Sequence, residues 1–199
     1  MYKRQMEGLR ILRRSFYERD PARAARDLLG KVLVRRIGPE ALSGRIVETE
    51  AYYGGGDPAS RAYRGKKNFN RVMFETPGRA FIYMVHTWWL LNIVAHREGE
   101  VGAVLIRALE PLGGVELMRR NRGRSDIRDL TTGPGKLTRA LAVTKELNGV
   151  DVTREDSPLT VAEGPREDFE IGASHRIGVR VDLPQKLRFF IKGNRFVSR

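Results

Sequence analysis

Short stretches of the chain alternate hydrophobic and polar residues, or gather apolar β-branched residues, and both patterns are typical of β-strands. KVLVRRI at 31–37 and GRIVETEAY at 44–52 are predicted strands, and the GPEALS segment at 38–43 is expected to be a hairpin loop. Residues 79–93 are rich in β-branched and aromatic residues, and they predict one strand, a turn near Thr87 and the start of another strand.

Two further strands are expected at 101–109 (VGAVLIRAL) and 187–192 (LRFFIK). The run Pro111-Leu112-Gly113-Gly114 is expected to end the first of them. Between residues 53 and 71 the chain is glycine-rich and basic, which predicts a loop.

Helix signals separate these strands. Asp20 can cap free amides and Pro21 fits a first turn, so a helix is expected to begin there and to close at Gly30. Further helices are expected over 115–122 and after a loop within 133–143. Consecutive strands with short loops pair antiparallel, so the prediction is an α+β fold with flanking helices on a curved antiparallel sheet, in a single domain over residues 1–199.

The charge narrows the choice of partner. A formal net charge of +13 and a pI near 10.6 favour a polyanion, and nucleic acid is the first candidate. Anionic lipid is a weaker alternative, because no lipidation motif is present, and a protein merely kept in solution by its charge is another.

Other function classes are disfavoured. With no cysteine, disulfides and thiolate chemistry are excluded, and the three histidines lack zinc-site spacing, so neither a metal nor a cofactor is expected. The longest uncharged run, 80–96, is too short for a membrane span. Charged residues break any apolar signal segment near the N-terminus, so we expect no secretion signal and a location in the cytoplasm (with the nucleoid) or the nucleus; these residues are Lys3, Arg4, Glu7, Arg10, Arg13 and Arg14.

Glu48, Glu50 and Tyr52 lie two residues apart and share one face of the predicted strand. Strand interiors disfavour glutamate, so two of them here require a reason. One reason is chemistry in a site. The alternative is a solvated strand face with salt bridges to Arg35 or Arg45.

Aromatic and basic residues are interleaved between residues 52 and 89, an arrangement that fits nucleic acid because cations hold phosphates and rings stack on bases. For Phe81, Trp88 and Trp89 a place in the core is the favoured interpretation. The GPGKL segment at 133–137 sets two glycines and a lysine at a helix start, which is either a phosphate site using Gly135 and Lys136 or a simple tight turn.

Several of these segments together resemble the alkyladenine (3-methyladenine) DNA glycosylases. The resemblance covers about residues 22–196, and its motifs occur in order and with matching spacing: GRIVETEAY at 44–52, DPAS at 57–60, MFETPGRAFIY at 73–83, LLN at 90–92, VLIRALEP at 104–111 and GPGKLTRAL at 133–141. It implies a curved antiparallel sheet with a protruding β-hairpin that enters the DNA minor groove, while a damaged purine flips into a pocket.

The resemblance also implies roles. Glu50 is expected to activate a water that attacks the sugar C1′, and Arg107 to hold that water or a phosphate. Tyr52 and Tyr83 are expected to stack on the flipped base, and Asn92 to exclude normal guanine. The implied activity is base-excision repair of alkylated or deaminated purines such as 3-methyladenine, 7-methylguanine or hypoxanthine in double-stranded DNA, without a cofactor. Independently of the resemblance, a monomer is expected, because the sequence has no long apolar stripe left over for an interface.

Two departures from the family pattern stand out. Arg61 follows DPAS where the family has a base-contacting histidine, so it either stacks in the pocket, disfavouring cationic bases, or turns outward to a phosphate. The hairpin segment MVHTWWLLN is about one residue shorter than the family pattern, which puts His86 at the wedge position, with Trp88 as a second candidate.

Two other functions stay open. A bifunctional glycosylase/lyase would use a lysine nucleophile, for which Lys136 is the candidate. A non-catalytic nucleic-acid-binding protein would keep the fold alone, although the presence of Glu50, Arg107 and Asn92 together argues against it.

Overall fold

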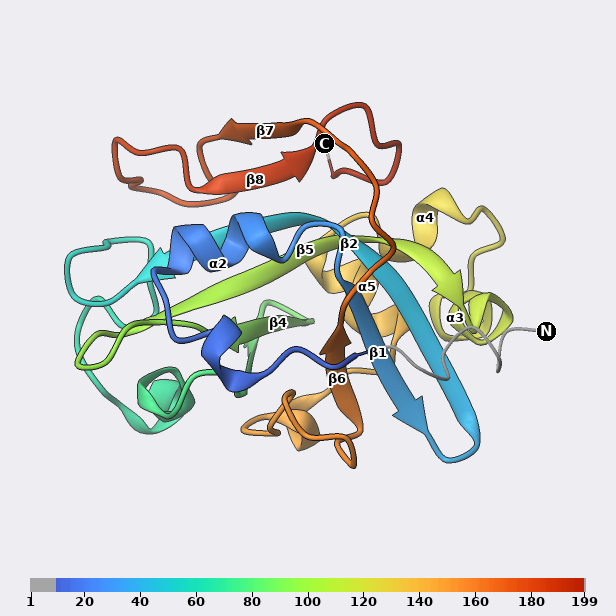
Figure 1. Cartoon of the computed structure of the whole chain (residues 1–199), viewed down its shortest axis with the longest axis horizontal. Coiled ribbons are helices and arrows are strands. Elements are labelled where there is room, and N and C mark those ends of the chain that lie inside the picture. Colours follow the sequence, from blue (N-terminus) through green and yellow to red (C-terminus); the bar gives the residue numbers. More distant parts are fainter. Residues whose placement is uncertain (1–9, 199) are drawn as a thin grey trace.

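The computed structural model describes residues 10–198; residues 1–9 and 199 lie outside the described residues, and with them the start of the charged segment that argued against a secretion signal. The described chain is built on one antiparallel sheet with the strand order β3-β4-β5-β2-β1-β6, to which β7 and β8 are attached through β2. The helices pack around it (Figure 1), so the predicted α+β class with a curved antiparallel sheet is confirmed.

The strands have the following bounds: β1 Val32–Ile37, β2 Glu40–Tyr53, β3 Ala80–Val85, β4 Trp88–Val94, β5 Gly102–Gly113, β6 Leu159–Ala162, β7 Ile171–Ser174 and β8 Arg188–Ile191. The α-helices are α2 Pro21–Asp27, α3 Val115–Arg122, α4 Arg128–Thr131 and α5 Pro134–Ala140. Three short 3-10 helices are η1 Arg14–Phe16, η2 Asn68–Phe74 and η3 Lys145–Leu147.

Strand β2 organises the sheet. One of its edges pairs with β5, and the other pairs first with β1 and then, from Glu48 to Glu50, with β8. Register shifts between β2 and β5 fall on both sides of Glu48, and such bulges bend and twist a strand. Figure 1 shows β2 and β5 running side by side through the middle of the molecule. The bend lies next to the two glutamates singled out from the sequence.

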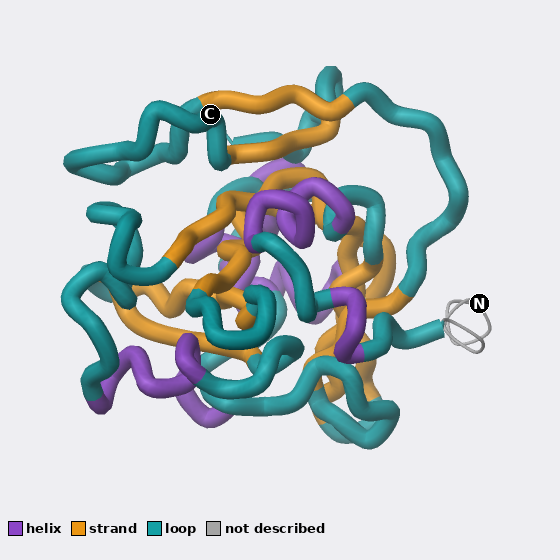
Figure 2. The backbone as a smooth tube through the Cα atoms, turned by 60° about the vertical axis from the view of Figure 1, so that its left-hand side comes forward, coloured by secondary structure: helices purple, strands orange, loops and turns teal. Residues whose placement is uncertain are grey.

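Helices fix the position of β2. Helix α2 begins as predicted, with the Asp20 carboxylate accepting hydrogen bonds from the backbone amides of Ala22 and Arg23, and it packs against β2. The Thr49 hydroxyl, on the face of β2 opposite Glu48 and Glu50, donates to the Ala25 carbonyl at 2.8 Å. Figure 2 shows α2 beside the β7–β8 pair, while α5 packs against β4 and β5.

Several predicted boundaries were wrong. Residues 38–43 do not form a loop, because Gly38 and Pro39 alone make the turn and β2 begins at Glu40. Strand β5 does not end before Pro111: it runs to Gly113, since Pro111 faces Gly44 beside a register shift where the ladder is already interrupted. The short strands β6 and β7 were not predicted, but the predicted last strand is β8.

The apolar interior divides into two clusters. The larger lies along β2, β4 and β5 and receives α2 and α5. The smaller contains Val72, Met73 and Phe81, and Tyr52 and Tyr83 pack against it. The two tyrosines predicted to hold a base therefore rest on a packed support rather than on a mobile loop.

Candidate active site

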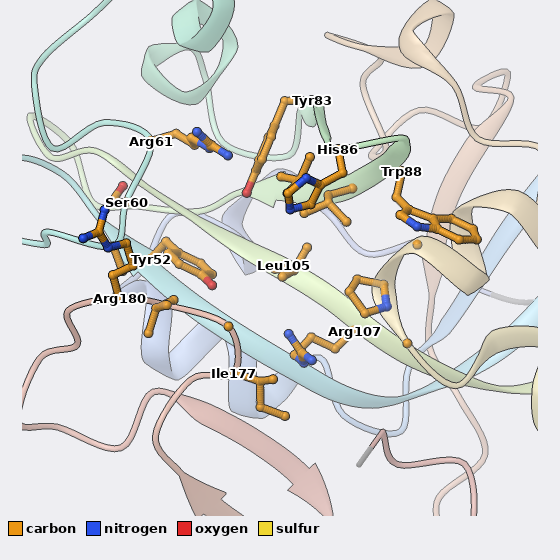
Figure 3. Close-up of a pocket in the computed structure, with 18 of the residues that line it drawn as sticks. Tyr52, Ser60, Arg61, Tyr83, His86, Trp88, Leu105, Arg107, Ile177 and Arg180 are labelled. Carbon is orange, nitrogen blue, oxygen red and sulfur yellow. The ribbon is translucent and has the colours of Figure 1, made fainter.

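A pocket of about 880 Å³ opens between β2, β3 and β5, the hairpin that joins β3 to β4, the start of α5 and the loop at 177–181. Tyr52, Tyr83 and Arg107 line it, together with Arg61 and His86 (Figure 3). Residues from six separate segments of the sequence thus meet here, the loop at 58–61 included. This volume lies within the range of about 300–1,000 Å³ that is typical of small-molecule pockets.

Glu48 and Glu50 lie beside this pocket and are both completely buried. The alternative of a solvated strand face is therefore wrong, and Arg45 instead pairs with Glu110 and Glu167. Arg107 lies between the two glutamates, with its Nε 2.8 Å from Glu48 Oε1 and its Nη1 3.2 Å from Glu50 Oε1. A shared guanidinium offsets the repulsion between two carboxylates on one strand face.

Both oxygens of Glu50 have donors. The backbone amide of Ile177 donates to Oε1 at 2.8 Å, and the Tyr52 hydroxyl donates to Oε2 at 2.8 Å. Burial raises the pKa of Glu50, an effect that Arg107 and these two donors offset only in part. A carboxylate held this way is a better proton acceptor than an exposed glutamate.

Glu48 has a different environment. It accepts from Arg107, from Arg188 Nε at 2.7 Å, and from the Ser198 backbone amide at 2.6 Å and hydroxyl at 2.8 Å. With these acceptor positions occupied, Glu48 anchors Arg107 and the C-terminal segment.

Two tyrosines form facing parts of the pocket wall, as Figure 3 shows for Tyr52 on β2 and Tyr83 on β3. Burial and the neighbouring Glu50 raise the pKa of Tyr52, which keeps its hydroxyl protonated as a donor. The Arg61 guanidinium carbon lies 4.7 Å from the centre of the Tyr83 ring. Of the two orientations considered for Arg61, the structure therefore has the stacked one.

Arg61 is positioned by a buried asparagine that sequence reasoning missed. Asn70, in η2, donates to the backbone carbonyls of Arg61 at 2.8 Å and Gly65 at 3.0 Å. Its own carbonyl accepts from the Lys67 amide at 2.6 Å. Asn70 thus closes the basic loop and holds Arg61 at the pocket.

Asn92 lies behind the pocket wall and is not among its lining residues. It is buried on β4, opposite Phe81, and donates to the Phe81 carbonyl at 3.2 Å. Its position next to Tyr83 and the pocket residue Leu105 keeps it near the predicted base site. Its role in excluding guanine stays a prediction.

The β3–β4 hairpin turns at His86 and Thr87, as the sequence predicted. His86 has a φ of 52°, a left-handed conformation that histidine tolerates better than most residues, and its side chain is exposed. Trp88, assigned to the core from the sequence, is instead 38% exposed: it is the first residue of β4, directly after the two-residue turn, and it lines the pocket. The hairpin tip thus presents two flat side chains.

The predicted phosphate segment has an observed packing role. A Cβ at Gly135 would lie 2.8 Å from Trp88 ring atoms, so glycine allows the indole to lie directly on the start of α5. Lys136 lines the pocket and pairs with Asp129 at 3.4 Å. The contact with phosphate stays a prediction for both residues.

Sequence reasoning also missed the loop that follows β7. Arg176 has a completely buried side chain and pairs with Asp57 of the DPAS segment, 2.6 Å from Nη1 to Oδ2. The only available signal was the unusual charge of Asp57 next to a proline in a glycine-rich loop. Among residues 10–198, no group of three or more His, Asp or Glu side chains is arranged to hold a metal ion.

Comparison with known proteins identifies the class. The family model described as methylpurine-DNA glycosylase (MPG) matches residues 15–195. A protein of Aeropyrum pernix is 45% identical over 192 residues, covering 96% of this chain and 94% of its own length. One of Methanoculleus marisnigri is 47% identical over 194 residues, covering 93% and 97%. Both carry the name "Putative 3-methyladenine DNA glycosylase".

The fold, the buried glutamates and these matches together define a DNA glycosylase, a hydrolase of N-glycosyl bonds. The chain belongs to the methylpurine-DNA glycosylase family. Within residues 10–198, none of the helices has the length and apolar character needed to cross a membrane.

The anchoring role of Glu48 predicts a large effect on stability. Glu48→Gln is expected to lower the free energy of unfolding by about 3–5 kcal/mol, because two buried arginines lose their shared carboxylate. Urea denaturation measures this. Glu116→Gln is the control, since Glu116 is 79% exposed and pairs on the surface with Arg119; equal effects of the two variants would contradict the assignment.

Proposed function

We propose that the protein releases damaged purines from duplex DNA by hydrolysis, with Glu50 as the general base. The observation that carries this proposal is the burial of Glu50 beside a pocket lined by Tyr52 and Tyr83, with a donor on each oxygen and a raised pKa. The names of the relatives support 3-methyladenine as one substrate. The site of action is then chromosomal DNA, in the cytoplasm or the nucleus.

The proposed reaction uses one water and no cofactor. Glu50 accepts a proton from the water while the water oxygen forms a bond to the sugar C1′. The electrons of the breaking glycosidic bond leave with the base. The negative charge of Glu50 also stabilises the positive charge that develops on the sugar. Arg107, 3.2 Å from Glu50, lines the pocket and fixes the orientation of the carboxylate.

Base binding is assigned to the two tyrosines. Tyr52 and Tyr83 offer aromatic surface to a purine that has left the duplex, and stacking of this kind contributes about 1–3 kcal/mol per base. The net charge of +13 supports binding to the DNA phosphates on either side of the flipped nucleotide. Against a non-catalytic binding protein stands the position of Glu50, because, of the two buried glutamates, it is the one that accepts hydrogen bonds from the pocket residues Tyr52 and Ile177.

The raised pKa of Glu50 predicts the pH dependence of the rate. Only the ionised carboxylate accepts a proton, so single-turnover release of hypoxanthine from a duplex should fall, as pH decreases, at a pH above the ordinary glutamate pKa. Release is measured by chromatography, and a protein-free duplex corrects for spontaneous base loss in acid. A rate that stays constant down to about pH 4.3, the ordinary glutamate pKa, would contradict the role of Glu50.

Stacked Arg61 predicts a preference for neutral over cationic bases. Arg61→His should lower the ratio of hypoxanthine to 7-methylguanine release by about tenfold, because a permanent positive charge beside the base is removed. Competition between two labelled duplexes measures the ratio. Arg64→His is the matched control, since Arg64 is exposed on the same loop and outside the base pocket; an unchanged ratio in Arg61→His would contradict the preference.

The exposed ring of His86 at the hairpin tip predicts a role as the DNA wedge. His86→Ala should weaken binding to a lesion-containing duplex by about tenfold, through loss of one stacking contact. His86→Gly removes the ring while accommodating the φ of 52°, and should behave alike. Fluorescence anisotropy measures affinity, with Thr87→Ala as control. Unchanged affinity in both His86 variants would remove His86 from this role and leave Trp88 as the candidate.

A further inference from the structure

Arg176 has a completely buried side chain next to the pocket, yet it does not line the pocket. Its Nη1 and Nη2 donate to the two oxygens of Asp57 at 2.6 and 2.7 Å, and Nη1 also donates to the Ala51 carbonyl at 3.0 Å. Its Nε donates to Asp182 Oδ1 at 2.8 Å. Each guanidinium nitrogen thus has an acceptor, and the plane of the group is fixed.

This fixed group contacts Tyr52 from behind. The Arg176 guanidinium carbon lies 4.5 Å from the centre of the Tyr52 ring. Tyr52 lines the pocket, whereas Arg176 does not. The ring is therefore held between Arg176 and the pocket. Because the Tyr52 hydroxyl donates to Glu50 Oε2, the position of the ring determines whether that hydrogen bond forms.

Arg176 also fixes the backbone on its C-terminal side. Its own amide donates to Asp182 Oδ2 at 2.9 Å, so the loop is pinned at both the main chain and the side chain of one residue. The next amide in the chain, that of Ile177, donates to Glu50 Oε1. The two hydrogen bonds that Glu50 accepts thus come from Tyr52, whose ring Arg176 contacts, and from Ile177, which follows Arg176 in the chain.

We propose that Arg176 is a positioning residue for Glu50: clamped by Asp57 and Asp182, it places the Ile177 amide and the Tyr52 hydroxyl on the two carboxylate oxygens. The clamp joins the DPAS loop at one end of β2 to the loop after β7, so the two loops set the position of Glu50 together. The effect of Arg176 on base release rests on the proposed function of Glu50. Its effect on the position and the titration of the Glu50 carboxylate does not.

The charged and titratable groups around Glu50 make the effect measurable. Arg107 approaches it from β5, Glu48 and Tyr52 lie on its own strand, Tyr83 faces it from β3, and Arg188 is opposite it on β8. The Ile177 amide and the Tyr52 hydroxyl favour the ionised form of Glu50. If they move away, the ionised form of Glu50 loses two donors, and this loss raises the pKa of Glu50.

Two variants separate positioning from charge. Arg176→Lys keeps the positive charge but loses the two-pronged contact with Asp57, so an effect of charge alone predicts no change at Glu50. Asp57→Asn removes a negative charge, so an effect of charge alone predicts a lower pKa at Glu50. Positioning predicts a higher pKa in both variants, by about one pH unit.

The test is a titration of the Glu50 carboxyl carbon by NMR in 13C-glutamate-labelled full-length protein, with Glu50→Gln assigning the signal. The matched control is Arg45→Lys, which alters another partly buried arginine pair on β2, that with Glu110, and should leave the titration unchanged. If the other variants do not fold, Asp182→Asn is a milder substitution, because the Asp182 side chain is 16% exposed. It should also raise the pKa of Glu50.

A rise of the Glu50 pKa in Arg176→Lys and in Asp57→Asn supports the proposal. An unchanged titration in Arg176→Lys, a fall in Asp57→Asn, or an equal rise in Arg45→Lys overturns it. The readout does not require base release, so a protein that releases no base would contradict the proposed function without touching this result. Where release is measured, the acid side of the pH–rate profile should move with the titration.

Discussion

Two carboxylates on one strand face, completely buried and joined by one arginine, are the constraint on which the rest of this structure depends. Burial of Glu48 and Glu50 is costly unless every oxygen has a partner. The partners come from β5, β8, the loop after β7 and the C-terminal segment: they are Arg107, Arg188, Ile177 and Ser198. The need to satisfy two acids therefore brings the C-terminal third of the chain onto the central strand.

The two acids have separate tasks because their partners differ. Glu48 accepts charged or backbone donors at each oxygen and stabilises the assembly. Glu50 receives one guanidinium contact, one amide and one hydroxyl, and adjoins the pocket formed with Tyr52. A single arginine thus links a structural acid to the proposed catalytic one, so stability and reactivity are coupled through Arg107.

Local pattern predicted much of the fold and part of the site. The alternation in β2 placed Glu50 and Tyr52 on one face, and the hairpin turn near Thr87 was correct. Predictions of strand ends were less accurate. The loop expected at 38–43 is a turn of Gly38 and Pro39 alone, and Pro111 does not end β5 because it lies beside a register shift.

Long-range contacts could not be predicted in the same way. Arg176 reaches Asp57 across 119 residues, and neither position belongs to a periodic pattern. Asn70 likewise donates to the backbone carbonyls of Arg61 and Gly65. Because every residue has a backbone carbonyl, the sequence does not indicate which ones Asn70 contacts. Trp88 was misplaced because hydrophobicity alone does not distinguish a core residue from an aromatic residue at a hairpin tip.

The central claim is that Glu50 performs the chemistry rather than only holding the pocket together. Single-turnover release of hypoxanthine from a duplex by the wild type and by Glu50→Gln tests it most directly, with binding to the same duplex measured in parallel. The amide keeps the shape of the side chain but cannot accept the proton. If Glu50 is the general base, the wild type releases hypoxanthine and the variant does not, while DNA binding persists in both. Release by the variant at the wild-type rate would contradict this role.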